Sequence, residues 1–174
     1  MHLKTDNFTR TTQGVCLRAL AMCSAACVED QDSIAIFDRN TLRRVDTWKI
    51  PKGHKNSPIV LDPQRHRLFV IARDPGILMQ LNSDTGALES SAPTPAEPDD
   101  ISFDASTQRI YVPGDGNLAV FDADGNGGLR LVQRLPTGPG ARAGMWIDSL
   151  RKYVVAVPSA GDKPAQVLIF AVAR

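Results

Sequence analysis

Short apolar segments separated by polar turns run through most of the chain, and three stretches follow one phrase. In each copy an apolar strand leads into an aspartate, a polar turn with a basic residue follows, and a second apolar strand begins; the copies cover residues 60–70, 102–112 and 146–155. Two apolar runs around a short polar turn are typical of a β-hairpin. The turn residues Asp62, Asp104 and Asp148 lie 42 and 44 residues apart. The sequence therefore predicts a repeat protein.

Each repeat also contains two further strands. Apolar runs lie at residues 34–37, 77–81, 117–121 and 166–170. The first three end in polar turns, after which strands return at residues 43–50, 87–91 and 129–135, the second of them weak. Four antiparallel strands in a period of this length are typical of a β-propeller blade. A β-sandwich is the alternative, but a sandwich does not need to repeat its turn chemistry in register. We therefore expect an all-β fold, a β-propeller of four-stranded antiparallel blades in a partial ring of about three to three and a half blades.

Four motifs carry a resemblance to a known family. They are Leu61-Asp62-Pro63 with the run 67–70, Phe103-Asp104 with the run 109–112, the turn Asp84-Thr85-Gly86, and the segment 136–142. On these motifs the chain resembles the YncE-like, YVTN-repeat bacterial β-propeller proteins over about residues 26–170. The resemblance implies a closed ring of about seven blades, of which this chain matches the C-terminal half. It also implies a periplasmic or secreted location.

The first residues do not follow the repeat. We divide the chain into an N-terminal segment, residues 1–25, and a partial propeller, residues 26–174. Basic residues followed by the apolar run 19–28 outline a secretory signal, although Asp6 and the short length of that run speak against one. No run reaches the roughly 18 apolar residues of a membrane-spanning helix, so none is expected.

Composition and charge exclude some classes of function. The net charge is +1, without the basic excess that is typical of nucleic-acid binding. Aromatic residues make up 6% of the chain, which also has 12 Pro and 13 Gly, as suits short strands joined by turns. Cys16, Cys23 and Cys27 are odd in number, and their spacing fits neither a zinc site nor a redox pair. We expect them to be small buried side chains or part of a poorly defined segment, with disulfide or metal chemistry as the alternative.

Polar residues gather in the loops that lead from one blade to the next. In a propeller these loops share a rim with the loops that join the second and third strands of each blade. The candidates for ligand binding on this rim are His54, Asn56, Glu97, Asp99, Asp100 and Arg142. Such a mixture of charges suits a polar ligand, and it is equally typical of a solvated rim. His54 with Asp100 could act as a general base, but no Ser or Cys forms a motif with them, so no catalytic residue is predicted.

One turn matches the first half of a calcium-binding loop. Asp122, Asp124 and Asn126 alternate as oxygen ligands require, and Gly127 stands at the sharp turn. The twelfth position is Gln133, where such loops have a bidentate Glu. Because Asx- and Gly-rich turns also join ordinary strands, the alternatives are a weak Ca²⁺ site and a plain hairpin turn. No other cofactor is expected.

These observations predict a non-catalytic repeat module, a binding or scaffold protein that acts on a protein or small-molecule partner through its rim. A lactonase-like hydrolase on the same fold is the alternative, because some relatives in the resemblance belong to that class. An open arc leaves apolar blade faces in water, at a cost on the order of 10 kcal/mol per face. The strand at residues 166–170 also leaves an unpaired edge. A homo-oligomer that completes the ring is therefore a further expectation.

Overall fold

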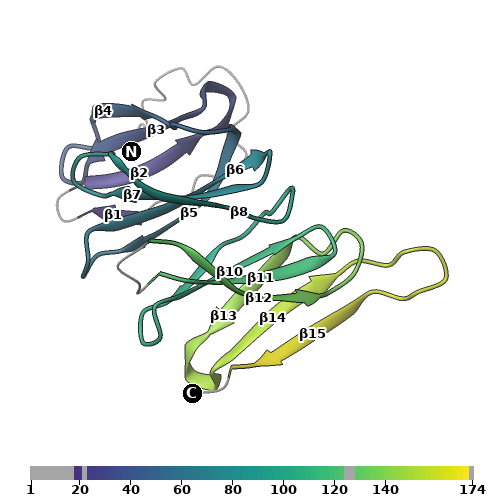
Figure 1. Ribbon diagram of the computed structural model, residues 1–174. Coiled ribbons are helices and arrows are strands. Elements are labelled where there is room, and N and C mark those ends of the chain that lie inside the picture. Colours follow the sequence, from purple (N-terminus) through teal and green to yellow (C-terminus); the bar gives the residue numbers. More distant parts are fainter. Residues whose placement is uncertain (1–17, 21–22, 124–127, 173–174) are drawn as a thin grey trace, which may run out of the picture.

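The computed structural model describes residues 18–20, 23–123 and 128–172, which form four antiparallel sheets side by side in an arc (Figure 1). We call them blades 1 to 4. Blade 1 holds β1 (Arg18–Leu20), β2 (Cys23–Val28), β3 (Ser33–Asp38) and β4 (Arg44–Lys49). Blade 2 holds β5 (His54–Asp62), β6 (Arg67–Asp74), β7 (Ile77–Asn82) and β8 (Leu88–Pro93). Blade 3 holds β9 (Ser102–Asp104), β10 (Arg109–Gly114), β11 (Asn117–Asp122) and β12 (Arg130–Pro136). Blade 4 holds β13 (Ala143–Ile147), β14 (Lys152–Val157) and β15 (Gln166–Ala171).

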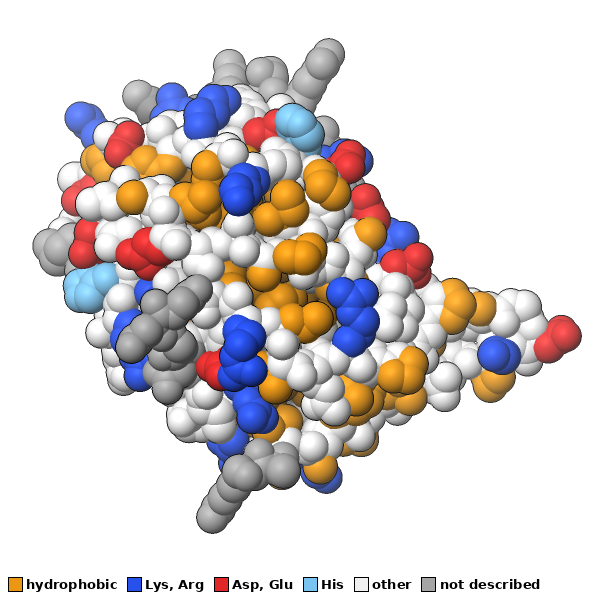
Figure 2. Space-filling model, in the orientation of Figure 1, with side chains coloured by type: hydrophobic (Ala, Val, Ile, Leu, Met, Phe, Trp, Pro, Cys, Tyr) orange, Lys and Arg blue, Asp and Glu red, His pale blue; other side chains and the backbone are white. Residues whose placement is uncertain are grey.

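The strands of each blade pair in sequence order, as expected for propeller blades. Two single turns of 3-10 helix, η1 (Glu29–Gln31) and η2 (Asp148–Leu150), lie between strands. No helix in the described part of the chain is long and apolar enough to cross a membrane. Basic and acidic side chains are intermixed on the face seen in Figure 2, in keeping with the small net charge.

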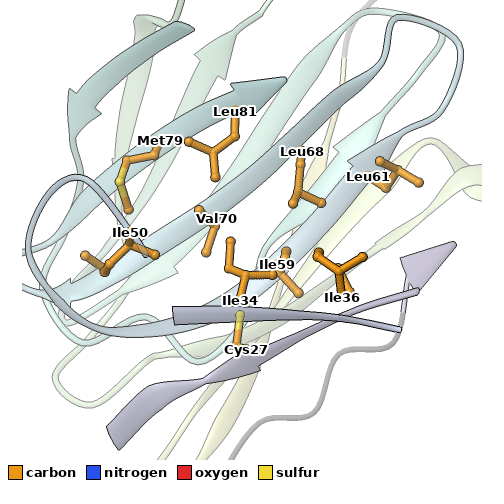
Figure 3. Close-up of a cluster of buried hydrophobic side chains, with 12 residues drawn as sticks. Cys27, Ile34, Ile36, Ile50, Ile59, Leu61, Leu68, Val70, Met79 and Leu81 are labelled. Atoms are coloured by element: carbon orange, nitrogen blue, oxygen red, sulfur yellow. The ribbon is translucent and has the colours of Figure 1, made fainter. Parts of the chain in front are cut away.

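Three apolar clusters hold successive blades together. Successive side chains of a strand point to opposite faces of a sheet, so β6 contributes side chains to two of these clusters. Leu68 and Val70 pack toward blade 1, in the cluster drawn in Figure 3, whereas Phe69 and Ile71 pack toward blade 3. The third cluster joins blades 3 and 4 around Tyr153. Each internal blade is thus buried on both faces.

The repeated turns have one backbone geometry. Four-residue loops connect the pairs Asp62↔Arg67, Asp104↔Arg109 and Ile147↔Lys152. The last residue of each loop has a positive φ: 52° at His66, 56° at Gln108 and 51° at Arg151. The structural repeat therefore spans 42 and then 43 residues. In the third copy Ile147, and not the expected Asp148, occupies the position of Asp62 and Asp104, since Asp148 begins η2.

Blade 1 begins earlier in the chain than the sequence indicated. β1 pairs with β2, so this sheet starts at Arg18 and has four strands, whereas the sequence placed the start of the propeller at residue 26. Cys27 is buried in the cluster between blades 1 and 2, and Cys23 packs against that cluster. Both agree with the prediction of small packing side chains. Cys16 lies outside the described residues.

Candidate functional site

The connections between blades lie at one end of the sheets, together with the loops that join β2 to β3, β6 to β7, β10 to β11 and β14 to β15. We call this end the ionic rim. It is formed by residues 29–32, 50–53, 75–76, 94–101, 115–116, 137–142 and 158–165. The opposite end, the turn rim, carries the repeated turns. All six predicted site residues lie on the ionic rim or at the adjoining strand ends, but the structure divides them into separate groups.

Arg73, at the end of β6, organises the largest group. Its Nη2 donates to Glu97 Oε2 at 2.9 Å and lies 3.0 Å from Asp99 Oδ1, while its Nη1 lies 3.5 Å from Glu29 Oε1. These carboxylates come from η1 of blade 1 and from the connection between blades 2 and 3. The Arg73 side chain is largely buried, so its ion pairs are less screened by water than exposed pairs. One guanidinium thereby links three successive blades.

A cavity of about 470 Å³ opens on the ionic rim beside this group. Asp99 and Arg142 line it together with an apolar wall that includes Val157, Pro158 and Val167. Their polar side chains are accessible, with 48% of Asp99 and 39% of Arg142 exposed. Within the described residues the one ion pair of Arg142 is with Glu97, at 3.9 Å. An acidic and a basic group therefore both remain open to a ligand in this cavity.

His54 belongs to a different pair. Its Nδ1 lies 2.7 Å from Asp32 Oδ2, and the backbone N–H of Lys55 donates to Asp32 Oδ1 at 2.8 Å. The hydrogen bond with Asp32 raises the pKa of His54 above 6.5, and the same bond is the main reason that the pKa of Asp32 falls below 3.8. The partner of His54 is thus Asp32 and not Asp100, because the loop that begins β5 lies against the loop of the preceding blade.

The His54–Asp32 pair predicts a measurable titration. In the wild type, NMR titration of the His54 ring is expected to give a pKa above 6.5, and Asp32→Asn is expected to return it toward that value. Because the folded pKa of His54 is raised, the stability from the pair is complete below the unfolded pKa and is lost as pH rises through the folded value. Because the folded pKa of Asp32 is lowered, the stability that Asp32 contributes is lost as pH falls through that folded pKa. An unchanged His54 pKa in Asp32→Asn would contradict this assignment.

Asp100 and Asn56 make contacts that serve packing between blades. Asp100 Oδ2 accepts a hydrogen bond from the Gly144 N–H at 3.0 Å, and burial raises the pKa of this carboxyl. Asn56 is fully buried, and its Nδ2 donates to the Ser33 carbonyl at 2.7 Å. In this conformation Asn56 is out of reach of a ligand in solution. The open part of the predicted site is therefore Glu97, Asp99 and Arg142, with His54 apart from them.

Of the three predicted calcium ligands, the structure describes only Asp122. Asp122 Oδ2 accepts a hydrogen bond from Arg130 at 2.6 Å, whereas Asp124 and Asn126 lie outside the described residues. In the part of the chain that the structure describes, no cluster of three or more His, Cys, Asp or Glu side chains is placed to hold a metal ion. The carboxylate of Asp122 is thus already paired with a cation of the protein.

Sequence reasoning missed three members of the rim: Glu29, Asp32 and Arg73. Glu29 and Asp32 precede the first complete copy of the repeated phrase, and Arg73 ends a strand that reads as buried. A signal was present in Arg73, because a buried strand that ends in a basic residue requires an acidic partner. Nothing in the spacing identified which carboxylates would meet it.

No family model matches the chain, and the search of curated proteins found no match. Solved structures do match. A hydrazine synthase from Kuenenia stuttgartiensis aligns with a TM-score of 0.78 and 12% identity, over 98% of this chain and 49% of that one. A Lactobacillus plantarum protein aligns with a TM-score of 0.70 and 16% identity, over 88% of this chain and 53% of that one. A Bacteroides fragilis protein whose name suggests a 6-phosphogluconolactonase aligns with a TM-score of 0.70 and 14% identity, over 91% of this chain and 55% of that one.

These similarities establish the fold as a β-propeller. The prediction of an all-β protein built from four-stranded antiparallel blades is confirmed. The chain spans about half the length of the solved structures that it matches. At these identities the likeness concerns the fold alone, because propellers carry many unrelated functions.

Proposed function

We propose that this chain is a non-catalytic β-propeller module of the YncE-like, YVTN-repeat kind, and that it binds the charged end of a peptide or a similar small zwitterion at the ionic rim. The observation that carries the proposal is the cavity of about 470 Å³ in which Asp99 and Arg142 share an apolar wall. A carboxylate of the ligand would pair with Arg142, and an ammonium group would pair with Asp99. A periplasmic or secreted location, proposed from the resemblance, would suit such a module.

Two features of the cavity support this ligand class. The carboxylates of Glu97 and Asp99 are held by Arg73, so the acidic side of the site is positioned before a ligand arrives. Arg142 is at 3.9 Å from Glu97, too far for a good hydrogen bond, and a ligand carboxylate would offer it a closer partner. The walls at Val157, Pro158 and Val167 suit an apolar side chain beside the charged end.

Binding of a defined zwitterion tests the proposal. The dipeptide alanylvaline is expected to bind saturably in isothermal titration calorimetry, and the same dipeptide blocked at both ends is expected to bind at least tenfold more weakly. Arg142→Gln and Asp99→Asn are each expected to raise the Kd for the free dipeptide about tenfold, because each removes a hydrogen bond to a charged group, worth about 1.5–3 kcal/mol.

The matched control is Arg130→Gln, which removes an exposed arginine on the turn rim. It is expected to leave the Kd unchanged. The proposal would be contradicted if the folded wild type did not bind the free dipeptide saturably. Equal affinity of Arg142→Gln and the wild type for this dipeptide would also contradict it.

A lactonase-like hydrolase is the competing function, which rests on the names of some proteins with similar structures. We expect no turnover of 6-phosphogluconolactone or simple lactones by the wild type, measured as acid release at constant pH. The reason is that His54 and Arg142, the side chains most suited to such a reaction, lie in separate groups with different partners. Turnover that disappears in both His54→Ala and Arg142→Ala would replace the binding proposal with the hydrolase.

A further inference from the structure

Blade 4 has an open face that consists almost entirely of apolar side chains. On this side of the sheet β13 places Met145, β14 places Val154, and β15 places Val167 and Ile169. Met145 is 59% exposed, Val167 is 62% exposed and Ile169 is 61% exposed. Hydrophobic side chains are visible over this part of the molecule, around β13–β15 (Figure 2). A sheet face of this kind is a candidate contact surface, because soluble proteins rarely leave contiguous apolar patches in water.

The repeat identifies this face as the one that internal blades bury. Lys152 follows the positive-φ residue of its turn, as Arg67 and Arg109 do in blades 2 and 3. Counting along the paired strands from these positions, Val167 of blade 4 corresponds to Leu78 of blade 2 and Leu118 of blade 3. Both leucines are fully buried against the next blade. Val167 thus stands where a neighbouring sheet belongs.

The other end of the arc does not offer a matching open face. In blade 1 the side chains of Ala25, Cys27 and Ile34 point toward blade 2, so by alternation Ala26 and Ala35 point away from it. Both of these alanines are buried. In the part of the chain that the structure describes, blade 4 is therefore the side on which a sheet face is exposed.

A second copy of the chain can supply the missing sheet only through the same face, which requires two-fold symmetry. The face is suited to this because Lys152 is its one charged residue in the described strands β13–β15. A two-fold axis that runs across the strands makes the facing strands antiparallel and places the two Lys152 side chains at opposite ends. The apolar residues of one copy then lie over those of the other, as in the packing of two sheets face to face.

We propose that the protein forms a two-fold dimer through the open face of blade 4, centred on Met145, Val154, Val167 and Ile169. Ala143, Ala156 and Val167 also line the cavity of the ionic rim, so the second copy lies beside that cavity and narrows its outer wall. The dimer does not depend on the proposed ligand. Its test therefore needs no ligand and can fail or succeed independently of the binding proposal.

The test measures mass in solution by size-exclusion chromatography with light scattering. The wild type is expected to have twice the 18.9 kDa mass of one chain at concentrations of about 100 µM. Val167→Glu and Ile169→Glu place a carboxylate in the apolar contact and are expected to weaken dimerisation at least tenfold. Val45→Glu is the matched control: Val45 is 57% exposed on a strand of blade 1, far from the proposed contact, and its replacement is expected to leave the dimer intact.

Circular dichroism and thermal melts establish that each variant is folded before its mass is interpreted. A wild type that is monomeric up to about 100 µM would overturn the proposal. A dimer that is equally stable in Val167→Glu and Ile169→Glu would also overturn it, because the contact would then lie elsewhere. Dissociation in all three variants, including Val45→Glu, would show that charge in general and not this face controls association.

Discussion

Replacing Arg67 with alanine is expected to lower the free energy of unfolding by about 3–5 kcal/mol. The Arg67 and Asp62 side chains are 9% and 1% exposed, and Arg67 Nη2 lies 2.7 Å from Asp62 Oδ2. Arg67 also donates to the Gln108 side chain and to the Ala123 carbonyl, both in blade 3. Without Arg67, the carboxylate of Asp62 stays buried with no compensating charge at this position, and one tie between blades 2 and 3 is lost.

Urea unfolding followed by circular dichroism measures this effect. Arg130→Ala is a suitable control, because Arg130 is 69% exposed and its ion pair with Asp122 is worth at most about 1 kcal/mol. A loss below about 1 kcal/mol in Arg67→Ala would mean that water replaces the guanidinium at little cost. In that event the buried pair would not be a main tie between the blades.

The second large effect is expected at Tyr153, which is fully buried between blades 3 and 4. Its ring stacks on Tyr111 with a centroid separation of 5.0 Å, and Tyr111 stacks in turn on Trp146 at 5.4 Å. Tyr153→Ala removes one ring of this stack and leaves a cavity, so the free energy of unfolding is expected to fall by about 3–5 kcal/mol. Loss of this packing would also release blade 4 from the arc.

Tyr153→Phe is the matched control because it keeps the ring and removes only the hydroxyl group. It is expected to change stability by less than about 1.5 kcal/mol. Thermal melts monitored by near-ultraviolet circular dichroism report both stability and the aromatic stack. Equal losses in Tyr153→Ala and Tyr153→Phe would mean that the hydroxyl group, and not the stacked ring, holds blade 4 in place.

The sequence predicted the blades well because their turns are local. Asp62 and Asp104 fix their own turns because their side chains accept hydrogen bonds from the backbone N–H groups two residues later. The third turn was predicted one residue out of register. Its position depends on the positive φ of Arg151 and on the single turn η2, and neither leaves a mark in residue type. Likewise, β1 is too short for its pattern to stand out in the N-terminal segment.

The site was predicted in part for the same reason. Loop residues such as Glu97, Asp99 and Arg142 could be assigned to a common rim from strand order alone. Which of them meet depends on how successive blades pack against one another, and this packing involves the apolar clusters between the blades as well as the loops. Arg73 was overlooked and His54 was given the wrong partner because both contacts cross from one blade to another.

The position of Arg73 has a mechanical consequence. A single side chain of blade 2 pairs with a carboxylate of blade 1 and with two carboxylates of the connection that leads to blade 3, so it links these blades at one point. A ligand that competes for those carboxylates is therefore expected to affect three successive blades, and not only the loop that it touches. Because the Arg73 side chain is largely buried, added salt is expected to screen these ion pairs only weakly, so the link between the blades is expected to persist as the ionic strength increases.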